Sequence, residues 1–297
     1  MNYKKIINPI LLTIAALIWG VAFVAQDMAS ATVKPFGVIA VRSYIAVIAL
    51  IPVILLMGKR APQPTIQGGG KKALILGGTL CGIALFAASF FQQLGIDLGT
   101  DSGKAGFLTA LYIIIVAVFG IITKRKFSLK ITIAVLIAIS GLYLLCVAKG
   151  SFSIELNDIF VFICSFIFAA HILIIDHFAP RTECIKMACI QFFVCGTLSL
   201  IAMFVSGEAT TIDGIISAAL PLLFLGIGSS GIAYTLQIIG QRDTDPTLAS
   251  ILMSLESVFA FFAGLLFGDS IDIRKGIGCV LMFGAIILAQ LPDKKKT

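Results

Sequence analysis

The sequence has little charge: Asp, Glu, Lys and Arg make up 12% of its 297 residues, about half the share that is usual in a soluble globular domain. Hydrophobic residues account for 59%, and the mean hydropathy is +1.07. A water-soluble domain of this length still exposes roughly a quarter of its chain, and too few polar residues are present to cover that surface. The composition therefore excludes an ordinary soluble protein and predicts a chain surrounded by membrane lipid.

Residue types that carry catalysis or metal binding are also scarce. The two histidines have no cysteine or carboxylate at ligand spacing, and no Cys-x-x-Cys pair occurs among the seven cysteines. Residues 226–231 match Gly-x-Gly-x-x-Gly, but they lie inside an apolar helical run instead of after a strand. The glycines at 68–70 are not followed by Gly-Lys-Ser or Gly-Lys-Thr. We therefore expect no metal, no nucleotide and no other cofactor.

Long apolar segments are abundant. Ten of them approach the roughly 20 residues that a helix needs to cross a bilayer, and they are too long and too uniform for barrel strands. We place them at about 8–28, 36–57, 73–94, 104–123, 129–148, 158–178, 184–205, 215–240, 247–267 and 275–291. The first is too long for the apolar part of a signal peptide. The predicted fold is an all-α integral membrane protein with ten transmembrane helices.

The distribution of the net charge of +7 indicates membrane topology. With the N-terminus inside and ten crossings, 16 of the 22 Lys and Arg residues fall on the inner side, five on the outer side and one, Arg42, within a span. This bias is typical of cytoplasmic loops. We expect a multi-pass protein of the cell inner (plasma) membrane with both termini in the cytoplasm. No basic stripe is interleaved with aromatics, so nucleic-acid binding is rejected.

The two halves of the chain resemble each other. A shift of 144 residues aligns Gln93 with Gln237 and, further along, the aspartates at 101 and 245. The same shift pairs Gly82 with Gly226, Phe90 with Tyr234 and Leu111 with Leu255, and a shift of 149 pairs Trp19 with Phe168 and Gly20 with Ala169. Each repeat, 1–149 and 150–297, holds five helices, so the second enters the membrane inverted. Inverted repeats recur in secondary transporters.

At this point the chain resembles the EamA-type transporters of the drug/metabolite transporter superfamily. The resemblance is carried by Trp19-Gly20 and by the stretch 246–269. Glu256 is kept there, whereas Ser257 replaces the family's frequent proline and Asp269 its terminal glutamate. The resemblance implies two EamA-like repeats, a central cavity between them, and export or exchange of small organic metabolites such as amino acids by alternating access.

Glu256 is the sharpest single feature, since a carboxylate in mid-membrane is costly unless it is paired, hydrated or protonated. It either lines the cavity, where it binds a substrate cation or carries a coupling proton, or it locks helices together through a hydrogen bond. The repeat pairs it with Tyr112.

Arg42 and Asp27 lie at similar depth in neighbouring spans. We predict an ion pair between them, acting as an outer gate, as an anchor for a substrate carboxylate or only as a structural contact. The alternative is an arginine whose charged end extends to the membrane surface.

Further polar and aromatic side chains within spans are candidates for substrate binding. His171 can relay protons, and Trp19 can stack on a solute. Amides and hydroxyls also hold helices together, so a packing role remains open for each. The candidate substrate-binding residues are Trp19, Gln93, Tyr112, His171, Tyr234, Gln237 and Glu256.

A secondary transporter that moves a small organic solute is the leading hypothesis, and we expect no enzymatic activity. The alternatives are a membrane-embedded enzyme and a lipid-handling membrane protein. Membrane enzymes usually place acidic, histidine or cysteine clusters near an interface, and the sequence has none above background.

Overall fold

A computed structural model describes residues 4–57, 70–100, 102–123, 129–146, 155–266 and 273–291. Within these ranges the chain is helical and no strand is present. Eight segments are long and apolar enough to cross a membrane, and two shorter apolar helices cover 104–120 and 129–144. The protein is therefore a multi-pass helical membrane protein. Each predicted span coincides with one of these ten segments, although the two shorter ones fall below the usual spanning length.

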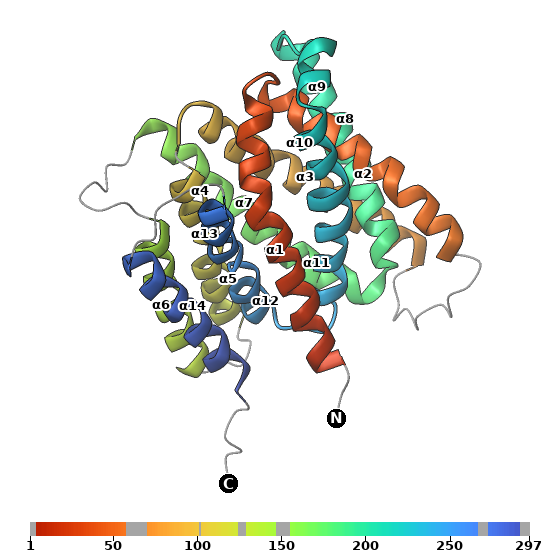
Figure 1. Cartoon of the computed structure of the whole chain (residues 1–297). Helices are drawn as coiled ribbons and strands as arrows, with labels where there is room; N and C mark the ends of the chain where they lie inside the picture. Colours follow the sequence, from red (N-terminus) through yellow and green to blue (C-terminus); the bar gives the residue numbers. More distant parts are fainter. Residues whose placement is uncertain are drawn as a thin grey trace.

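The helices follow one another as an up-and-down bundle (Figure 1). Their bounds are α1 Lys4–Ser30, α2 Pro35–Met57, α3 Gly70–Asp97, α4 Ser102–Ala110, α5 Tyr112–Ile122, α6 Leu129–Cys146, α7 Leu156–Phe178, α8 Cys184–Ser206, α9 Ile212–Ser217, α10 Ala219–Leu223, α11 Tyr234–Gln241, α12 Pro246–Met253, α13 Glu256–Leu266 and α14 Ile273–Gln290. A short 3-10 turn, η1 Ala179–Arg181, follows α7, and a π-helix, η2 Phe224–Ala233, joins α10 to α11. The first turn of α1 and the last turn of α14 lie at the same end of the bundle (Figure 1).

Residues with fixed backbone preferences set the ends of several helices. Pro35 and Pro246 open α2 and α12, and the carboxylate of Asp245 accepts hydrogen bonds from the first backbone N–H groups of α12. Gly207 ends α8 in the left-handed conformation, with φ at 68°. Proline at a first helical position and glycine just after the last one are the usual signals, which explains why these boundaries were predictable.

Two spans are interrupted at positions 144 residues apart. The break between α4 and α5 falls at Leu111, and the break between α12 and α13 covers Ser254 and Leu255. The second break forms without a proline, since residues 254–257 are Ser-Leu-Glu-Ser. Its backbone closes with short i→i+3 bonds from Leu255 to Leu252 and from Ser257 to Ser254, and the Ser254 hydroxyl donates to the carbonyl of Ile251. A serine hydroxyl thus satisfies a carbonyl at the break.

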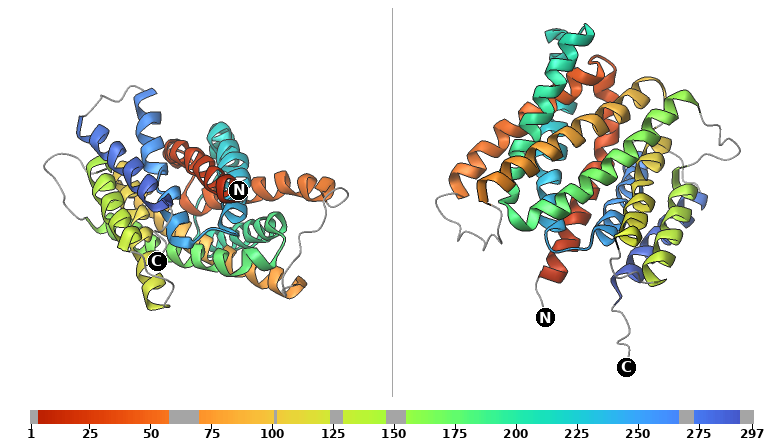
Figure 2. Two further views of the ribbon diagram at one scale, coloured as in Figure 1. Left: turned by 90° about the horizontal axis from the view of Figure 1, so that it is seen from below. Right: turned by 180° about the vertical axis from the view of Figure 1, so that it is seen from behind.

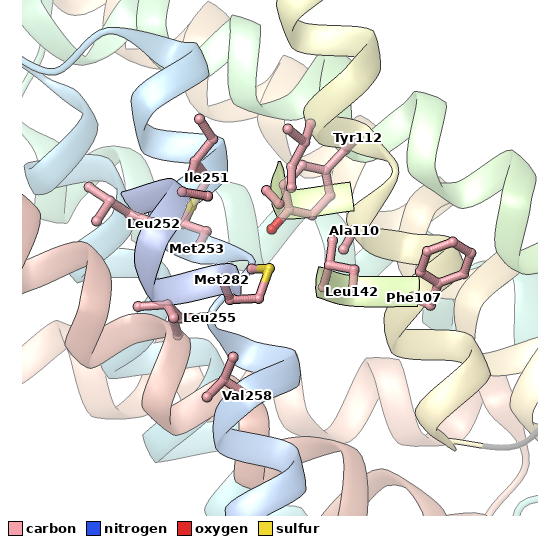
Figure 3. Packing of buried hydrophobic residues seen from close by; sticks show 14 of the residues in the cluster. Phe107, Ala110, Tyr112, Leu142, Ile251, Leu252, Met253, Leu255, Val258 and Met282 are labelled. Carbon is pink, nitrogen blue, oxygen red and sulfur yellow. The ribbon is translucent and has the colours of Figure 1, made fainter. Parts of the chain in front are cut away.

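The interrupted helices run side by side. α12 packs along α5 and α13 along α4, so the two breaks face each other in antiparallel helices. Figure 3 shows Ala110 and Tyr112 on one side and Ile251, Met253 and Leu255 on the other, with their side chains pointing toward a shared core. This arrangement places the residue after each break, Tyr112 and Glu256, in the middle of the bundle.

In the remaining packing, helices of one half mainly contact helices of the other half. α1 packs against α10–η2–α11 and against α12–α13, whereas α7 packs against α3 and against α4–α5. α2 lies beside α8, and α6 beside α14, which form the pair at one edge in Figures 1 and 2. The contacts that α1 makes with the second half therefore have counterparts in the contacts that α7 makes with the first half.

Two glycines, also 144 residues apart, make equivalent close contacts. A Cβ atom at Gly82 in α3 would lie 2.7 Å from the backbone oxygen of Gln191 in α8. A Cβ atom at Gly226 in η2 would lie 2.4 Å from the side chain of Ile45 in α2. Small residues allow helix backbones to approach closely in membranes. Gly226, the first glycine of the stretch 226–231, thus serves close packing, and it does so in a π-helix. Asp101 and Asp269, used in the sequence comparison, lie outside the described residues.

Candidate functional site

A cavity lies between the two halves of the bundle. It contains about 560 Å³ of empty space, counting the space at its opening. Its walls come from α1, α2, α3, α4, α5, α7, η2, α11, α12 and α13. The lining residues are Trp19, Ala22, Phe23, Gln26, Arg42, Gln92, Thr109, Tyr112, Phe168, His171, Ile172, Ser229, Tyr234, Gln237, Met253 and Glu256. Both interrupted spans and both halves contribute to this single site.

Helical spacing brings these side chains to the cavity. Trp19, Phe23 and Gln26 are separated by four and three residues, so they share one face of α1. Phe168 and His171 share a face of α7 in the same way. α1 of the first half and α7 of the second half thus both bring aromatic and polar residues to the cavity.

Arg42 is the cationic residue of the cavity lining and is only 6% exposed. Its Nη1 donates to Oε1 of Gln26 at 3.2 Å, and its Nη2 donates to Oγ of Ser89 at 2.8 Å. The predicted ion pair with Asp27 is not formed, because Asp27 is exposed on another face of α1. Adjacent residues point about 100° apart on a helix, so Gln26 faces Arg42 and Asp27 faces away.

Glu256 is the first residue of α13 and is also 6% exposed. Its Oε1 atom is buried without a hydrogen-bond partner. The N-terminus of a helix carries a partial positive charge, which favours a carboxylate at this position. Tyr112, the first residue of α5, lines the same cavity and is 5% exposed.

His171 is fully buried and hydrogen-bonded on one side only. Its Nε2 lies 2.8 Å from Oε1 of Gln191, whereas its Nδ1 has no partner. Because Oε1 of an amide can only accept, Nε2 carries the proton and Nδ1 is left as an acceptor. The Gln191 contact thus fixes both the orientation and the tautomer of the ring.

Trp19 and Tyr234 form the aromatic part of the wall. Their rings meet edge to face with centroids 4.8 Å apart, and Trp19 Nε1 donates to the backbone oxygen of Ser229 at 3.3 Å. Tyr234 also contacts the ring of His171, with centroids 5.9 Å apart. Gln237, one turn further along α11, is 2% exposed, and its Oε1 has no hydrogen-bond partner.

The structure brings seven of the nine candidate residues to the cavity and leaves two elsewhere. The seven are Trp19, Arg42, Tyr112, His171, Tyr234, Gln237 and Glu256. Asp27 is exposed, and Gln93 instead donates to Oγ of Ser30 at 2.6 Å. The neighbour of Gln93, Gln92, lines the cavity and donates to Oγ1 of Thr109 at 3.0 Å.

Several lining residues were not among the candidates: Phe23, Gln26, Gln92, Thr109, Phe168 and Ser229. The spacing of Gln26, seven residues after Trp19, was a usable signal, because that distance returns to the same face of a helix. No such signal separates Gln92 from Gln93. Within the described residues, no three His, Cys, Asp or Glu side chains lie close enough to hold a metal ion.

The fold and the cavity define a helical membrane protein with a polar, partly charged site between its two halves. The chain belongs to the EamA-like transporter family, whose model matches residues 7–147 and again residues 156–291. This places it in the drug/metabolite transporter superfamily and makes it a membrane transporter.

Two further comparisons agree with this assignment. The chain is 27% identical over 290 residues to a protein of Archaeoglobus fulgidus described as an uncharacterized transporter, covering 97% of this chain and 87% of that protein. A solved crystal structure matches the fold with a TM-score of 0.77 at 20% identity, over 95% of this chain and 96% of the other. At that identity the second match concerns the fold alone.

Proposed function

We propose that this transporter moves small organic metabolites such as amino acids across the plasma membrane by alternating access. The observation that carries the proposal is the cavity, which both halves line and which contains one buried guanidinium, that of Arg42, and one buried carboxyl group, that of Glu256. Ionisable residues within membrane spans commonly mark the pathway of a substrate or an ion.

Two inverted five-helix repeats, 1–149 and 150–297, are part of this proposal. Three observations support them: the family model matches the chain twice, the interrupted spans lie 144 residues apart, and the helix contacts exchange between the halves. In such transporters the two halves rock around a site near the middle of the membrane. A cavity lined by both halves supports this mechanism.

The proposal also includes the orientation of the chain in the membrane and the coupling of transport to protons. The charge distribution favours cytoplasmic termini, and the first turn of α1 and the last turn of α14 lie at the same end of the bundle, as this requires. Glu256 is the carboxyl group of the cavity lining, so we assign it as the site at which a proton couples to transport.

The test uses purified full-length protein in liposomes loaded with a defined mixture of amino acids, sugars, nucleosides and organic acids. Mass spectrometry of the external buffer measures which solutes leave, with empty liposomes as background. We expect saturable efflux of one chemical class, accelerated by the same solute outside and changed by a pH difference across the membrane.

Glu256→Gln should remove the effect of the pH difference. The matched control is Glu183→Gln, because Glu183 lies between α7 and α8, outside the cavity, and pairs with Lys186. Absence of saturable efflux for every solute would contradict the proposal. Release of modified products instead of the loaded solutes would favour a membrane enzyme.

A further inference from the structure

Some close contacts between the halves occur twice, once in each copy. A Cβ atom at Gly95 in α3 would lie 3.0 Å from the backbone oxygen of Asn157 in α7. A Cβ atom at Gly240 in α11 would lie 3.2 Å from the backbone oxygen of Asn8 in α1. The shift of 149 residues pairs Asn8 with Asn157, so α11 meets α1 as α3 meets α7. Contacts present in both copies do not distinguish the two sides of the membrane.

The ion pair between Lys104 and Asp158 belongs to one copy only. Nζ of Lys104 in α4 lies 2.5 Å from Oδ2 of Asp158 in α7, so the pair joins the first half to the second. The shift of 144 residues pairs Lys104 with Leu248, and the shift of 149 pairs Asp158 with Pro9. Neither Leu248 nor Pro9 can form an ion pair. The first turns of α4 and α7 lie opposite to the first turn of α1 (Figures 1 and 2), at the outer end in the proposed orientation.

Three groups bind the carboxylate of Asp158. Its side chain is 2% exposed, against 20% for that of Lys104. Besides the contact with Lys104, Oδ1 accepts a hydrogen bond from Oγ1 of Thr100 at 3.2 Å, and Oδ2 accepts one from the backbone N–H of Glu155 at 2.8 Å. Thr100 precedes α4, and Glu155 precedes α7. One carboxylate thus joins the start of α4 to the start of its own helix.

These contacts allow the ion pair to break and form again. If α4 moved away from α7, Asp158 would lose Lys104 and Thr100 but keep the N–H of Glu155 and the positive end of α7. Lys104 lies in the first turn of α4 and is already partly exposed. A broken ion pair is costly when a charge stays buried, whereas water would reach both groups here. The contact is therefore suited to a pathway that closes and opens.

The inner end of α1 borders empty space at the position that corresponds to Asp158. Pro9 lines a groove with about 680 Å³ of empty space, counting the space at its opening. The other residues of the groove are Ile6, Ile10, Thr13 and Ile14 of the same helix and Gln290 of α14. The outer end of α7 is thus joined to the first half by an ion pair, and the inner end of α1 has a groove instead.

We propose that Lys104, Asp158 and Thr100 form the outer gate of this transporter, and that the structure is the state in which this gate is closed. Opening of the cavity to the outside separates α4 from α7 and breaks the ion pair. The gate lies away from Asp27 and Arg42, where the sequence suggested one. This inference rests on the proposed function, because a gate requires that the two halves move.

The experiment measures how fast a thiol in the cavity reacts from each side of the membrane. The reporter is Ser229→Cys in the full-length protein with its native cysteines replaced by alanine, since Ser229 lines the cavity. A membrane-impermeant maleimide is added to right-side-out and inside-out vesicles without solute. With the gate residues intact, we expect labelling from the inside to be at least about tenfold faster than from the outside, because the closed state dominates. This first comparison needs no gate variant and so does not depend on folding of one.

Substitutions then test the gate itself. Asp158→Asn and Lys104→Gln should each speed labelling from the outside at least about tenfold, because a charge-assisted hydrogen bond is lost. Lys104→Arg keeps the opposite charge and should leave labelling slow. The double variant Lys104→Gln/Asp158→Asn should label no faster than the faster single variant, since both changes remove one interaction.

The matched control is Asp97→Asn. Asp97 pairs with Lys34 at 3.4 Å at the same outer end, but both residues belong to the first half. Labelling should therefore not change. Melting temperatures and size-exclusion profiles of every variant identify a loss of folding, which would speed labelling from both sides alike.

The outcomes separate the gate from the proposed function. Labelling of the reporter protein that is equal from both sides, or faster from the outside, would overturn the gate, and so would equal effects of Asp158→Asn and Asp97→Asn. If liposomes show saturable transport in that case, the gate alone fails. If labelling changes as expected but no amino acid moves, the gate stands and the proposed substrate class fails. Labelling from neither side in any variant would contradict both.

Discussion

The two interrupted spans have the same backbone design but different chemistry. Each breaks in mid-bundle, and each begins its second half with a buried side chain that faces the cavity. In the first half that side chain is the phenol of Tyr112, and in the second it is the carboxyl of Glu256. Two spans with the same backbone break thus carry different side chains, and the second of them brings a carboxyl group to the cavity.

The largest effect is expected when the carboxyl group of Glu256 is removed from the second interrupted span. Glu256→Gln keeps the size of the side chain but cannot oppose a cation. We expect about 10- to 100-fold weaker binding of the transported solute, because hydrogen bonds to charged groups contribute about 1.5–3 kcal/mol. Isothermal titration measures the affinity. Unchanged binding would show that the carboxyl group only joins helices.

The next prediction concerns the close packing of α1 against α13 beside Glu256. A Cβ atom at Gly20 would lie 2.7 Å from the backbone oxygen of Glu256 and 2.7 Å from Cβ of Phe259, so α1 and α13 would have to separate. We expect Gly20→Ala to destabilise the protein by about 1–3 kcal/mol, measured as a lower melting temperature.

The shift of 149 residues pairs Gly20 with Ala169 in α7. This position is already an alanine and is 1% exposed. Ala169→Gly is therefore the control and should cost only about 0.5–1 kcal/mol, the usual effect of glycine in a helix. Equal effects of the two substitutions would contradict the close contact at Gly20.

A smaller effect is expected from the first half of the comparison. Tyr112→Phe removes one neutral hydroxyl from the cavity and leaves the ring in the core. Neutral hydrogen bonds contribute about 0.5–1.5 kcal/mol, so affinity for the solute should fall by at most about tenfold. Titration under the same conditions as Glu256→Gln makes the two sides directly comparable. A larger loss than in Glu256→Gln would show that Tyr112 contributes more to binding than Glu256, which contradicts this comparison.

The smallest effect should come from introducing a proline at the second break. Ser257 lies in the first turn of α13, where proline is tolerated, and Ser257→Pro removes one backbone bond, to the oxygen of Ser254 at 3.2 Å. We expect a loss of about 1 kcal/mol or less. Ala138→Pro in the uninterrupted α6 should cost about 3 kcal/mol or more. Similar melting temperatures for both variants would show that the break is not a stable feature.

Much of the fold could be predicted from the sequence, because spans of apolar residues must be helical in a bilayer. The segment predicted at 158–178, for example, corresponds to α7 at Leu156–Phe178. The interruptions could not be predicted. The break at Leu111 has no proline or glycine at that residue, and the π-helix at Phe224–Ala233 depends on how η2 packs against α1 and α2.

The candidate site was predicted less completely, for a physical reason. In a soluble helix the polar face identifies the opposite, buried face, but in a membrane both the lipid face and the core face are apolar. The sequence therefore identifies which helices carry polar residues without identifying the direction in which each points. The structure places Gln92 at the cavity, next to the predicted Gln93, and Gln26, next to the predicted Asp27.

The account depends most on the cavity being reachable from both sides of the membrane in turn. Ser229 lines the cavity from η2 and is 3% exposed, so a Ser229→Cys variant, with the native cysteines replaced by alanine, places one thiol there. Its reaction with a membrane-impermeant thiol reagent is measured in right-side-out and inside-out vesicles. We predict labelling from either side, slowed from both by the transported solute. Labelling from one side only, unaffected by solute, would contradict alternating access through this cavity.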